Sequence, residues 1–154
     1  MHDIGIVAEL AAMQKEFENA FELARTQGAP LCEAEKAILG LTHGEAGQII
    51  GEGWHLPAHL IAVATYHHQP QNCNANRDLV ALVSLSDLLC RMSGLGHGYD
   101  EVRQVNFAEE PGFAMLHDEC PSLRDFDWAR FTFEMEAYME EVHRLVAALY
   151  RPPQ

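Results

Sequence analysis

The chain has 154 residues, 48% of them hydrophobic, which is enough for one domain over 1–154 with a core of its own, so extended disorder is not expected. Its 23 acidic residues outnumber the 10 basic ones and give a formal net charge of −13, which would repel a phosphate backbone, so we expect no nucleic-acid partner. Apolar runs are short and Met1 is not followed by a signal-peptide pattern, so we expect a cytoplasmic protein without a membrane partner.

The first third of the chain predicts two helices. Apolar residues recur at helical spacing from Ile6 to Ala24, which indicates one helix that ends before Gly28. A second, short helix is expected over 31–39.

The next expected helix has a clear start. Thr42 and Glu45 have the spacing of a capping box, so Thr42 is the expected N-cap and His43 the first helical residue. His43 and Trp54 lie on one face, which we expect to point toward the core. Glycines three and four residues apart on this helix would let a neighbouring helix approach closely: Gly44, Gly47 and Gly51.

The remaining pattern is also helical. Pro57 opens a helix, at its first position, whose apolar run ends in His67 and His68. The stretch 77–92 is apolar on almost every face and indicates a central, buried helix. Loops with short helical pieces are expected up to Asp127.

A long C-terminal helix over about 126–150 carries a regular apolar seam. Docking on its own domain is the interpretation that we favour for this seam, and pairing of two chains in a homodimer is the alternative. No segment alternates with the period of a strand, so the expected fold class is all-α.

Asp87 is the first residue that points to chemistry. It falls on the same helical stripe as Val80 and Val83, where an unpaired carboxylate is unfavourable. It therefore needs a metal ion, another cation, hydrogen-bond donors or a water-filled cleft. A buried carboxylate bonded to backbone N–H groups or to one arginine satisfies the same pattern.

Histidines and a second aspartate supply further donors. His43 begins a helix and His67 and His68 end another, while His2 and Asp3 lie at the N-terminus. Imidazoles and carboxylates on the helices of a bundle are ligands for Mn, Fe, Zn or Mg ions. Taken singly, His43 also fits a hydrogen-bonded core residue, and the histidine pair fits favourable charge at a helix end. The other histidines are interpreted as surface or loop residues: His55, His59, His97, His117 and His143.

The wording of these motifs resembles a known family. "HDIG", then "EKAILGLTHGEAGQIIGEGWHLPAHLIAVATYHHQP", then "LVALVSLSDLLCRMSG" are similar to the latter part of an HDOD domain. That domain is a bacterial signalling branch of the HD superfamily of metal-dependent phosphohydrolases. The resemblance covers about residues 1–96 and implies a helical bundle of the HD-domain type. We expect it to lack the N-terminal helices and to end in a long helix.

The resemblance also implies a metal site. HD domains build it from a histidine on an upstream helix, a histidine-aspartate pair and an aspartate on a later helix. By this resemblance His2 and Asp3 are the pair, with Asp3 able to bridge two ions, and Asp87 is the final aspartate. Further histidines match ligand positions of the HD-GYP branch, which cleaves cyclic di-GMP: His43, His67 and His68. One or two divalent ions (Fe, Mn, Zn or Mg) are the expected cofactor.

Three functions remain open at this point. The favoured one is a signal-transduction or regulatory module that contacts a signalling protein partner and carries a vestigial or structural metal site. It is favoured because "HHQPQNCNANRD" stands where HD-GYP proteins continue with an acidic residue and Gly-Tyr-Pro, and because the upstream histidine is missing. The alternative is a metal-dependent phosphohydrolase acting on a phosphorylated small molecule, such as a cyclic dinucleotide or nucleotide. Its candidates for holding phosphate are Lys36, Arg77 and Arg91. In the third, the histidines only pack.

Overall fold

The computed structural model describes residues 1–102, 105–123 and 125–149, apart from the side chains of residues 132 and 136. Its contacts divide the chain into two compact units, Met1–Pro121 and Ser122–Gln154, and each is described by itself. The described residues form helices and no strand, which confirms the expected all-α fold.

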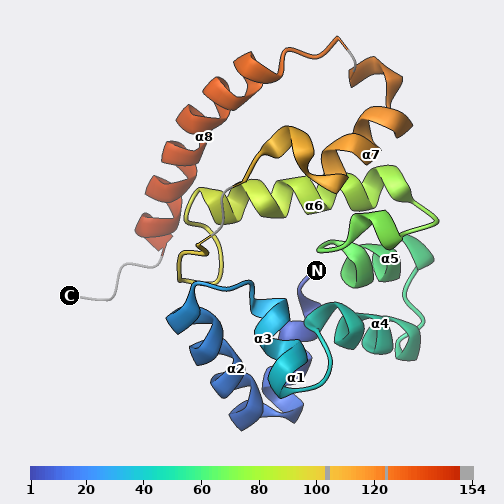
Figure 1. Ribbon diagram of the computed structural model, residues 1–154, viewed down its shortest axis with the longest axis vertical. Helices are drawn as coiled ribbons and strands as arrows, with labels where there is room; N and C mark the ends of the chain where they lie inside the picture. Colours follow the sequence, from blue (N-terminus) through green and yellow to red (C-terminus); the bar gives the residue numbers. More distant parts are fainter. Residues whose placement is uncertain (103–104, 124, 150–154) are drawn as a thin grey trace. The chain divides into compact units, whose positions relative to one another are not determined.

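The first unit contains seven α-helices among its described residues (Figure 1). They are α1 (Ile4–Ala12), α2 (Gln14–Gln27), α3 (Leu31–Ile38), α4 (His43–Gly53), α5 (Ala58–Tyr66), α6 (Arg77–Met92) and α7 (Pro111–Glu119). Short 3-10 helices accompany them: η1 (Pro70–Asn72) before α6, η2 (Phe107–Glu109) before α7, and η3 (Pro121–Leu123) at the boundary between the units.

The single helix predicted from Ile6 to Ala24 is wrong, because the structure breaks it into α1 and α2. Met13 lies between them with φ −137° and ψ 47°, outside the helical region. The break is caused by packing, since α1 lies against α4 whereas α2 lies against α3. Accordingly, α1 buries Gly5 and Glu9 instead of the predicted apolar stripe.

The other predicted helix boundaries agree closely with the structure. Gly28 ends α2 in the left-handed conformation, with φ 61°. Thr42 and Glu45 form the capping box of α4: Thr42 Oγ1 accepts from Glu45 N at 3.2 Å, and the Glu45 carboxylate accepts from Thr42 N at 2.7 Å. Pro57 is the N-cap of α5 instead of its first residue.

Glycines bring α1, α4 and α5 close together, as the spacing on α4 predicts. A Cβ on Gly44 would lie 2.8 Å from the carbonyl oxygen of Thr65 on α5, and a Cβ on Gly5 of α1 would overlap the carbonyl oxygen of His43. His43 is therefore enclosed between two helices. Trp54, expected on the same buried face, is instead 66% exposed at the end of α4.

Helix α6 is buried on one side and exposed on the other, so it is not the fully buried helix that its sequence predicts. Val80 and Leu85 are at most 4% exposed, whereas Leu82 and Met92 are more than half exposed. It packs against α5 and against α7. Two apolar clusters, one around Phe17 between α2 and α3 and one around Val80 between α5 and α6, stabilise the elements that carry the site.

The second unit contains α8 (Trp128–Leu149), in agreement with the predicted helix over about 126–150, whose last residue lies outside the described ones. Its seam includes exposed apolar side chains such as Tyr138, Leu145 and Leu149. What covers this seam stays a prediction. Among the described residues, no helix is both long and apolar enough to cross a membrane.

Candidate metal centre

The N-terminus enters between α4, α5 and α6, and it brings together the residues that the sequence singled out (Figure 1). Two groups of side chains have potential ligand atoms within 4.8 Å of one another and share Asp3. The first group is Asp3, His43, His67 and His68, and the second is His2, Asp3 and Asp87.

His43 is completely buried and held by a carboxylate that the sequence analysis missed. Its backbone N–H and its ring Nδ1 both contact Glu35 Oε2, at 2.9 and 2.7 Å. Because Nδ1 donates to this carboxylate, the neutral ring keeps its lone pair on Nε2. That atom lies 3.3 Å from Nε2 of His67 and 2.9 Å from Nε2 of His68.

His67 is oriented in the same way by the backbone of α5. Its Nδ1 lies 3.1 Å from the carbonyl oxygen of Val63 and 3.0 Å from that of Ala64, so Nδ1 donates and Nε2 is left free. In His68, burial and the neighbouring His67 and His43 lower the pKa to about 2, which keeps its ring neutral. The Nε2 atoms of His43, His67 and His68 thus converge. Lone pairs on neighbouring nitrogen atoms repel one another unless a proton or a cation lies between them.

Asp3 adds an oxygen to this convergence. Its Oδ1 is buried and has no hydrogen-bond partner among the described residues, although it lies 3.3 Å from Nε2 of His67 and 3.7 Å from Nε2 of His43. Burial disfavours its charge, yet the hydrogen bond between His2 and the other oxygen, Oδ2, holds the pKa of Asp3 well below its usual range. An ionised oxygen without a partner, facing imidazole lone pairs, is the donor set of a divalent ion. The residues therefore fit a metal.

The second group is more open. His2 Nε2 lies 3.0 Å from Asp3 Oδ2 and 3.6 Å from Asp87 Oδ1, and hydrogen bonds with these two carboxylates raise the pKa of His2 to about 9. Asp87 also accepts a 2.9 Å hydrogen bond from Nε of Arg91. Burial opposes ionisation of Asp87, but His2 and Arg91 keep its pKa at about 2. Asp87 is thus paired with one arginine, as expected for a buried structural carboxylate. It also lies beside His2, as expected for a metal ligand.

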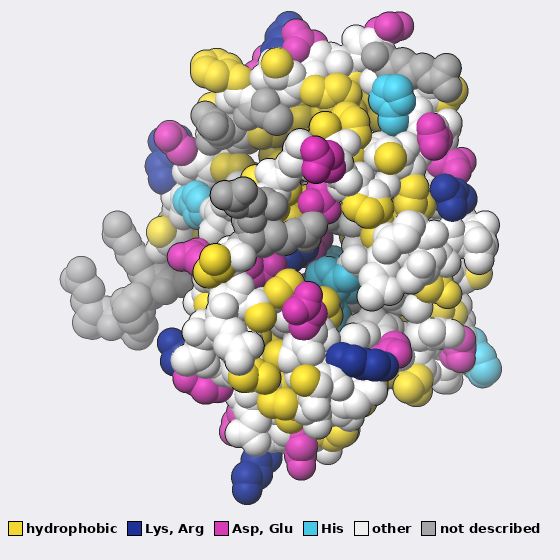
Figure 2. Space-filling model, viewed as in Figure 1, with side chains coloured by type: hydrophobic (Ala, Val, Ile, Leu, Met, Phe, Trp, Pro, Cys, Tyr) yellow, Lys and Arg dark blue, Asp and Glu magenta, His cyan; other side chains and the backbone are white. Residues whose placement is uncertain are grey.

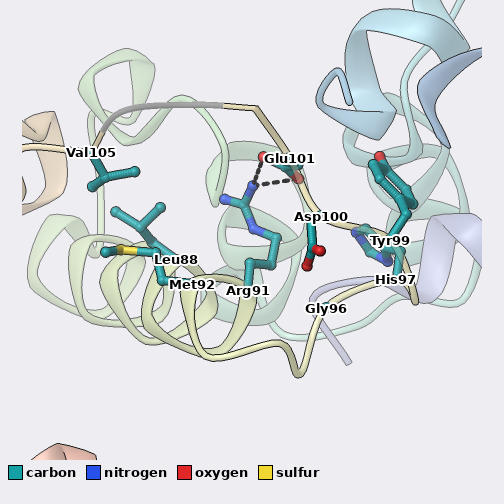
Figure 3. A pocket seen from close by; sticks show the side chains of 9 residues that line it. All are labelled: Leu88, Arg91, Met92, Gly96, His97, Tyr99, Asp100, Glu101 and Val105. Atoms are coloured by element: carbon teal, nitrogen blue, oxygen red, sulfur yellow. Dashed lines mark hydrogen bonds and ion pairs between the residues drawn. The ribbon is translucent and has the colours of Figure 1, made fainter. Parts of the chain in front are cut away.

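A cavity of about 310 Å³ lies beside this open group (Figure 3). Arg91 extends from α6 and donates to both carboxylate oxygens of Glu101, at 2.9 and 2.8 Å, and both residues line this cavity. Its lining residues come from α6 and the following loop: Leu88, Arg91, Met92, Gly96, His97, Tyr99, Asp100, Glu101 and Val105. A second hollow of about 310 Å³ is lined by His2, Asp3, Asp87 and His97, among others. Small ligands therefore have room next to the candidate metal ligands.

His97 is a loop residue, as expected, but the structure places it in a context that the sequence analysis missed. It lines both hollows, and its ring centre lies 6.5 Å from that of His43. Burial lowers its pKa. The surrounding "GLGHGYD" has no helical period that could have placed it.

Glu9 and Glu35 are the other missed residues, although a signal for Glu35 exists. It follows Leu31 by four residues and so shares the apolar face of the helix predicted over 31–39. A charged residue on such a face needs a partner. The sequence gives no comparable signal for Glu9, because the apolar stripe predicted from Ile6 to Ala24 is formed by other residues.

The basic side chains proposed to hold phosphate are already paired with carboxylates. Lys36 donates to Glu45 at 2.8 and 2.9 Å, Arg77 contacts Glu119 at 2.6 Å, and Arg91 lies between Asp87 and Glu101. Figure 2 shows acidic side chains spread over the visible face, and several of them have a basic side chain beside them. The described surface near the cluster therefore has no strong attraction for phosphate.

Comparison with known proteins finds similarity to one family. Residues 1–70 match the HDOD domain family model. A crystal structure of an HDOD domain protein with unknown function from Geobacter sulfurreducens is similar, with a TM-score of 0.83 and 22% sequence identity over 98% of this chain and 52% of that one. The chain thus spans about half the length of that protein. No curated protein sequence matches. Residues 1–70 are therefore similar to HDOD domains, and the chain shares its helical fold with an HDOD domain protein.

Proposed function

We propose that this chain is a regulatory HDOD-type module for signal transduction, and that a divalent metal ion at its N-terminal segment serves a structural or switching role. The observation that supports it best is the convergence of Asp3 Oδ1 with the Nε2 atoms of three buried or half-buried histidines. Three imidazole nitrogens and one carboxylate oxygen suit Zn, Fe or Mn. His2 and Asp87 extend the same ligand set on its open side.

The origin of the ligands explains how an ion could carry a signal. His43, His67 and His68 belong to α4 and the end of α5, whereas His2 and Asp3 precede α1. An ion bound by both sets ties the N-terminal segment to the rest of the unit. Occupancy of the site would then be read by a protein partner as a change in the order of this segment.

A metal-dependent phosphohydrolase is the second candidate, because the two ligand groups share Asp3. Asp3 would then help to hold an ion in each group, and two such ions would supply an activated water and positive charge next to a phosphoryl group. The substrate would be a phosphorylated small molecule, such as a cyclic dinucleotide or nucleotide. The pairing of Lys36, Arg77 and Arg91 with carboxylates favours regulation over this activity.

Metal binding is tested by elemental analysis and by competition titration with Zn²⁺ and Mn²⁺. We expect at least one ion per chain, and Asp3→Ala should weaken binding by about 100-fold, because it removes the oxygen that both ligand groups share. The control is His59→Ala, since His59 is exposed on α5 and outside the cluster. A wild-type chain that binds no ion, or an Asp3→Ala variant that binds as tightly as wild type, contradicts the proposal.

Regulation and hydrolysis are separated by two measurements on the metal-loaded protein. Hydrogen exchange should show that the amides of the first turn of α1 become protected when the ion binds. An assay with a generic phosphodiester should give no turnover above that of Asp3→Ala. Turnover that depends on Asp3 would favour the hydrolase instead.

A further inference from the structure

A pair of buried carboxyl groups lies behind His43, on the side of the ring away from the ligand cluster. Glu9 of α1 is 1% exposed and Glu35 of α3 is 0% exposed. Glu35 Oε2 accepts the two hydrogen bonds from His43, but Glu35 Oε1 and both oxygens of Glu9 receive none from any described residue. Buried acceptors without partners are rare in proteins, so this arrangement needs an explanation.

The two carboxyl groups have too little positive charge around them for both to be ionised. Among the described residues, the only ion pair of either group is the one between Glu35 and His43. Lys36, the neighbour of Glu35 in sequence, is exposed and paired with Glu45, whose own charge also acts on Glu9. Two carboxylates that face each other in a buried site share a proton.

The hydrogen bonds show which of the two carries that proton. Glu35 already accepts two hydrogen bonds, from the backbone N–H and the ring Nδ1–H of His43, so it acts as the acceptor of the pair. Glu9 has no such donors, and its burial and the charge of Glu35 raise its pKa to about 8. Its side chain lies within hydrogen-bonding range of Glu35, so a protonated Glu9 finds its acceptor there.

We propose that Glu9 is a neutral buried acid that donates a hydrogen bond to Glu35 and thereby positions His43 as a metal ligand. Glu35, held from one side by Glu9, accepts the Nδ1–H of His43 and directs Nε2 toward the cluster. A hydrogen bond from Nδ1–H to a carboxyl oxygen also makes the ring a stronger ligand. Glu9 is a positioning residue, because it acts through Glu35 and does not belong to the ligand groups.

This arrangement gives α1 two links to the metal centre. Its N-cap, Asp3, offers a ligand oxygen directly. Six residues later, about 9 Å along the helix, Glu9 reaches the opposite side of His43 through Glu35 on α3. Figure 1 shows α1, α3 and α4 grouped together, as these contacts require. A shift of α1 would therefore disturb the metal centre at both points. The predicted effect of Glu9 on metal binding rests on the proposed function, because it requires a metal ion at this site.

The test compares two substitutions of Glu9 in the full chain. Glu9→Gln keeps the shape and a hydrogen-bond donor, so we expect zinc affinity within about threefold of wild type. Glu9→Leu keeps the volume but removes the donor, and it should weaken zinc binding by about 10- to 100-fold, the usual effect of losing support for a ligand. Val80→Ala is the control, since it opens a cavity in the α5–α6 cluster, away from Glu9. It should lower stability with little effect on zinc affinity.

Two spectroscopic measurements do not depend on metal binding. Infrared spectra of the wild-type protein near pH 6 should contain the carbonyl band of a buried protonated carboxyl group, and Glu9→Gln should lack it. Nitrogen chemical shifts of the His43 ring should show a proton on Nδ1 in wild type and Glu9→Gln, and a mixture of tautomers in Glu9→Leu.

The outcomes separate this inference from the proposed function. If the chain binds no zinc but its infrared spectrum shows the carboxyl band, the metal site is refuted and the protonation of Glu9 is supported. Absence of the band, or zinc affinity of Glu9→Leu equal to wild type, overturns the positioning role. Loss of a bound ion in Glu9→Gln would mean that a cation, and not a proton, joins the two carboxylates. If Glu9→Leu does not fold, the band and the His43 tautomer in Glu9→Gln decide.

Discussion

The two sides of the candidate metal centre are held in different ways. On the buried side, His43 and His67 are at most 1% exposed, and each ring is oriented through Nδ1 by Glu35 or by backbone carbonyls of α5. On the open side, the side chains of His2 and Asp3 are 30% and 33% exposed and contact mainly other candidate ligands. The fold therefore orients the first set before any ion binds, whereas the second set depends on its own charges.

This difference predicts how substitutions divide between stability and binding. A change on the buried side alters packing, hydrogen bonds and ligand geometry together, because the same contacts serve all three. A change on the open side alters the ligand set with little cost to the fold.

Gly5→Ala should have the largest effect. Its Cβ would overlap the carbonyl oxygen of His43 and lie 2.9 Å from the backbone nitrogen of Gly47, so α1 has to move away from α4. We expect a loss of about 3 kcal/mol or more in the free energy of unfolding, measured by urea denaturation. Gly53→Ala is the matched control, because nothing lies within 4 Å of its Cβ. If both variants were equally stable, the close contact between α1 and α4 would be refuted.

The second prediction concerns pH and the buried carboxyl pair. An unfolded chain releases the Glu9 proton at the ordinary pKa of 4.5, whereas the folded chain keeps it up to about 8. The folded state thus binds more protons between these values, and the free energy of unfolding falls as pH rises through this window. Glu9→Gln removes this contribution, so its stability relative to wild type should increase by about 1 to 3 kcal/mol from pH 4.5 to pH 8.

The measurement is urea denaturation of wild type and Glu9→Gln across this pH range. Titrating groups distant from Glu9 are common to both chains and cancel in the difference, which therefore reports on Glu9 together with its neighbour Glu35. Glu16→Gln, on the exposed surface of α2, should run parallel to wild type. If the free energy of unfolding of Glu9→Gln also ran parallel to that of wild type across this pH range, Glu9 would be ionised in the folded protein.

The same division explains what the sequence could predict. The position of His43 follows from the capping box of Thr42 and Glu45, which is a local signal, and Asp87 stands out because its neighbours on the helix are apolar. Glu9 could not be assigned a role, because its burial depends on the break at Met13 and on the packing of α1 against α4. Sequence periodicity records which face of a helix is apolar, but the partner of a buried polar group comes from another helix.

His2→Gln should have the smallest effect on the fold and still reduce metal binding. The His2 side chain is 30% exposed, and ion pairs of this kind contribute about 0 to 1 kcal/mol, so we expect the free energy of unfolding to change by about 0.5 kcal/mol or less. Zinc affinity should fall by about 10-fold, since Nε2 of His2 belongs to one of the two ligand groups. The matched variant on the buried side is His43→Gln, which also leaves the Glu35 carboxylate without the Nδ1–H donor. It should lose about 2 kcal/mol or more of stability together with metal binding. Equal losses of stability in the two variants would show that the open side is held by the fold as firmly as the buried one.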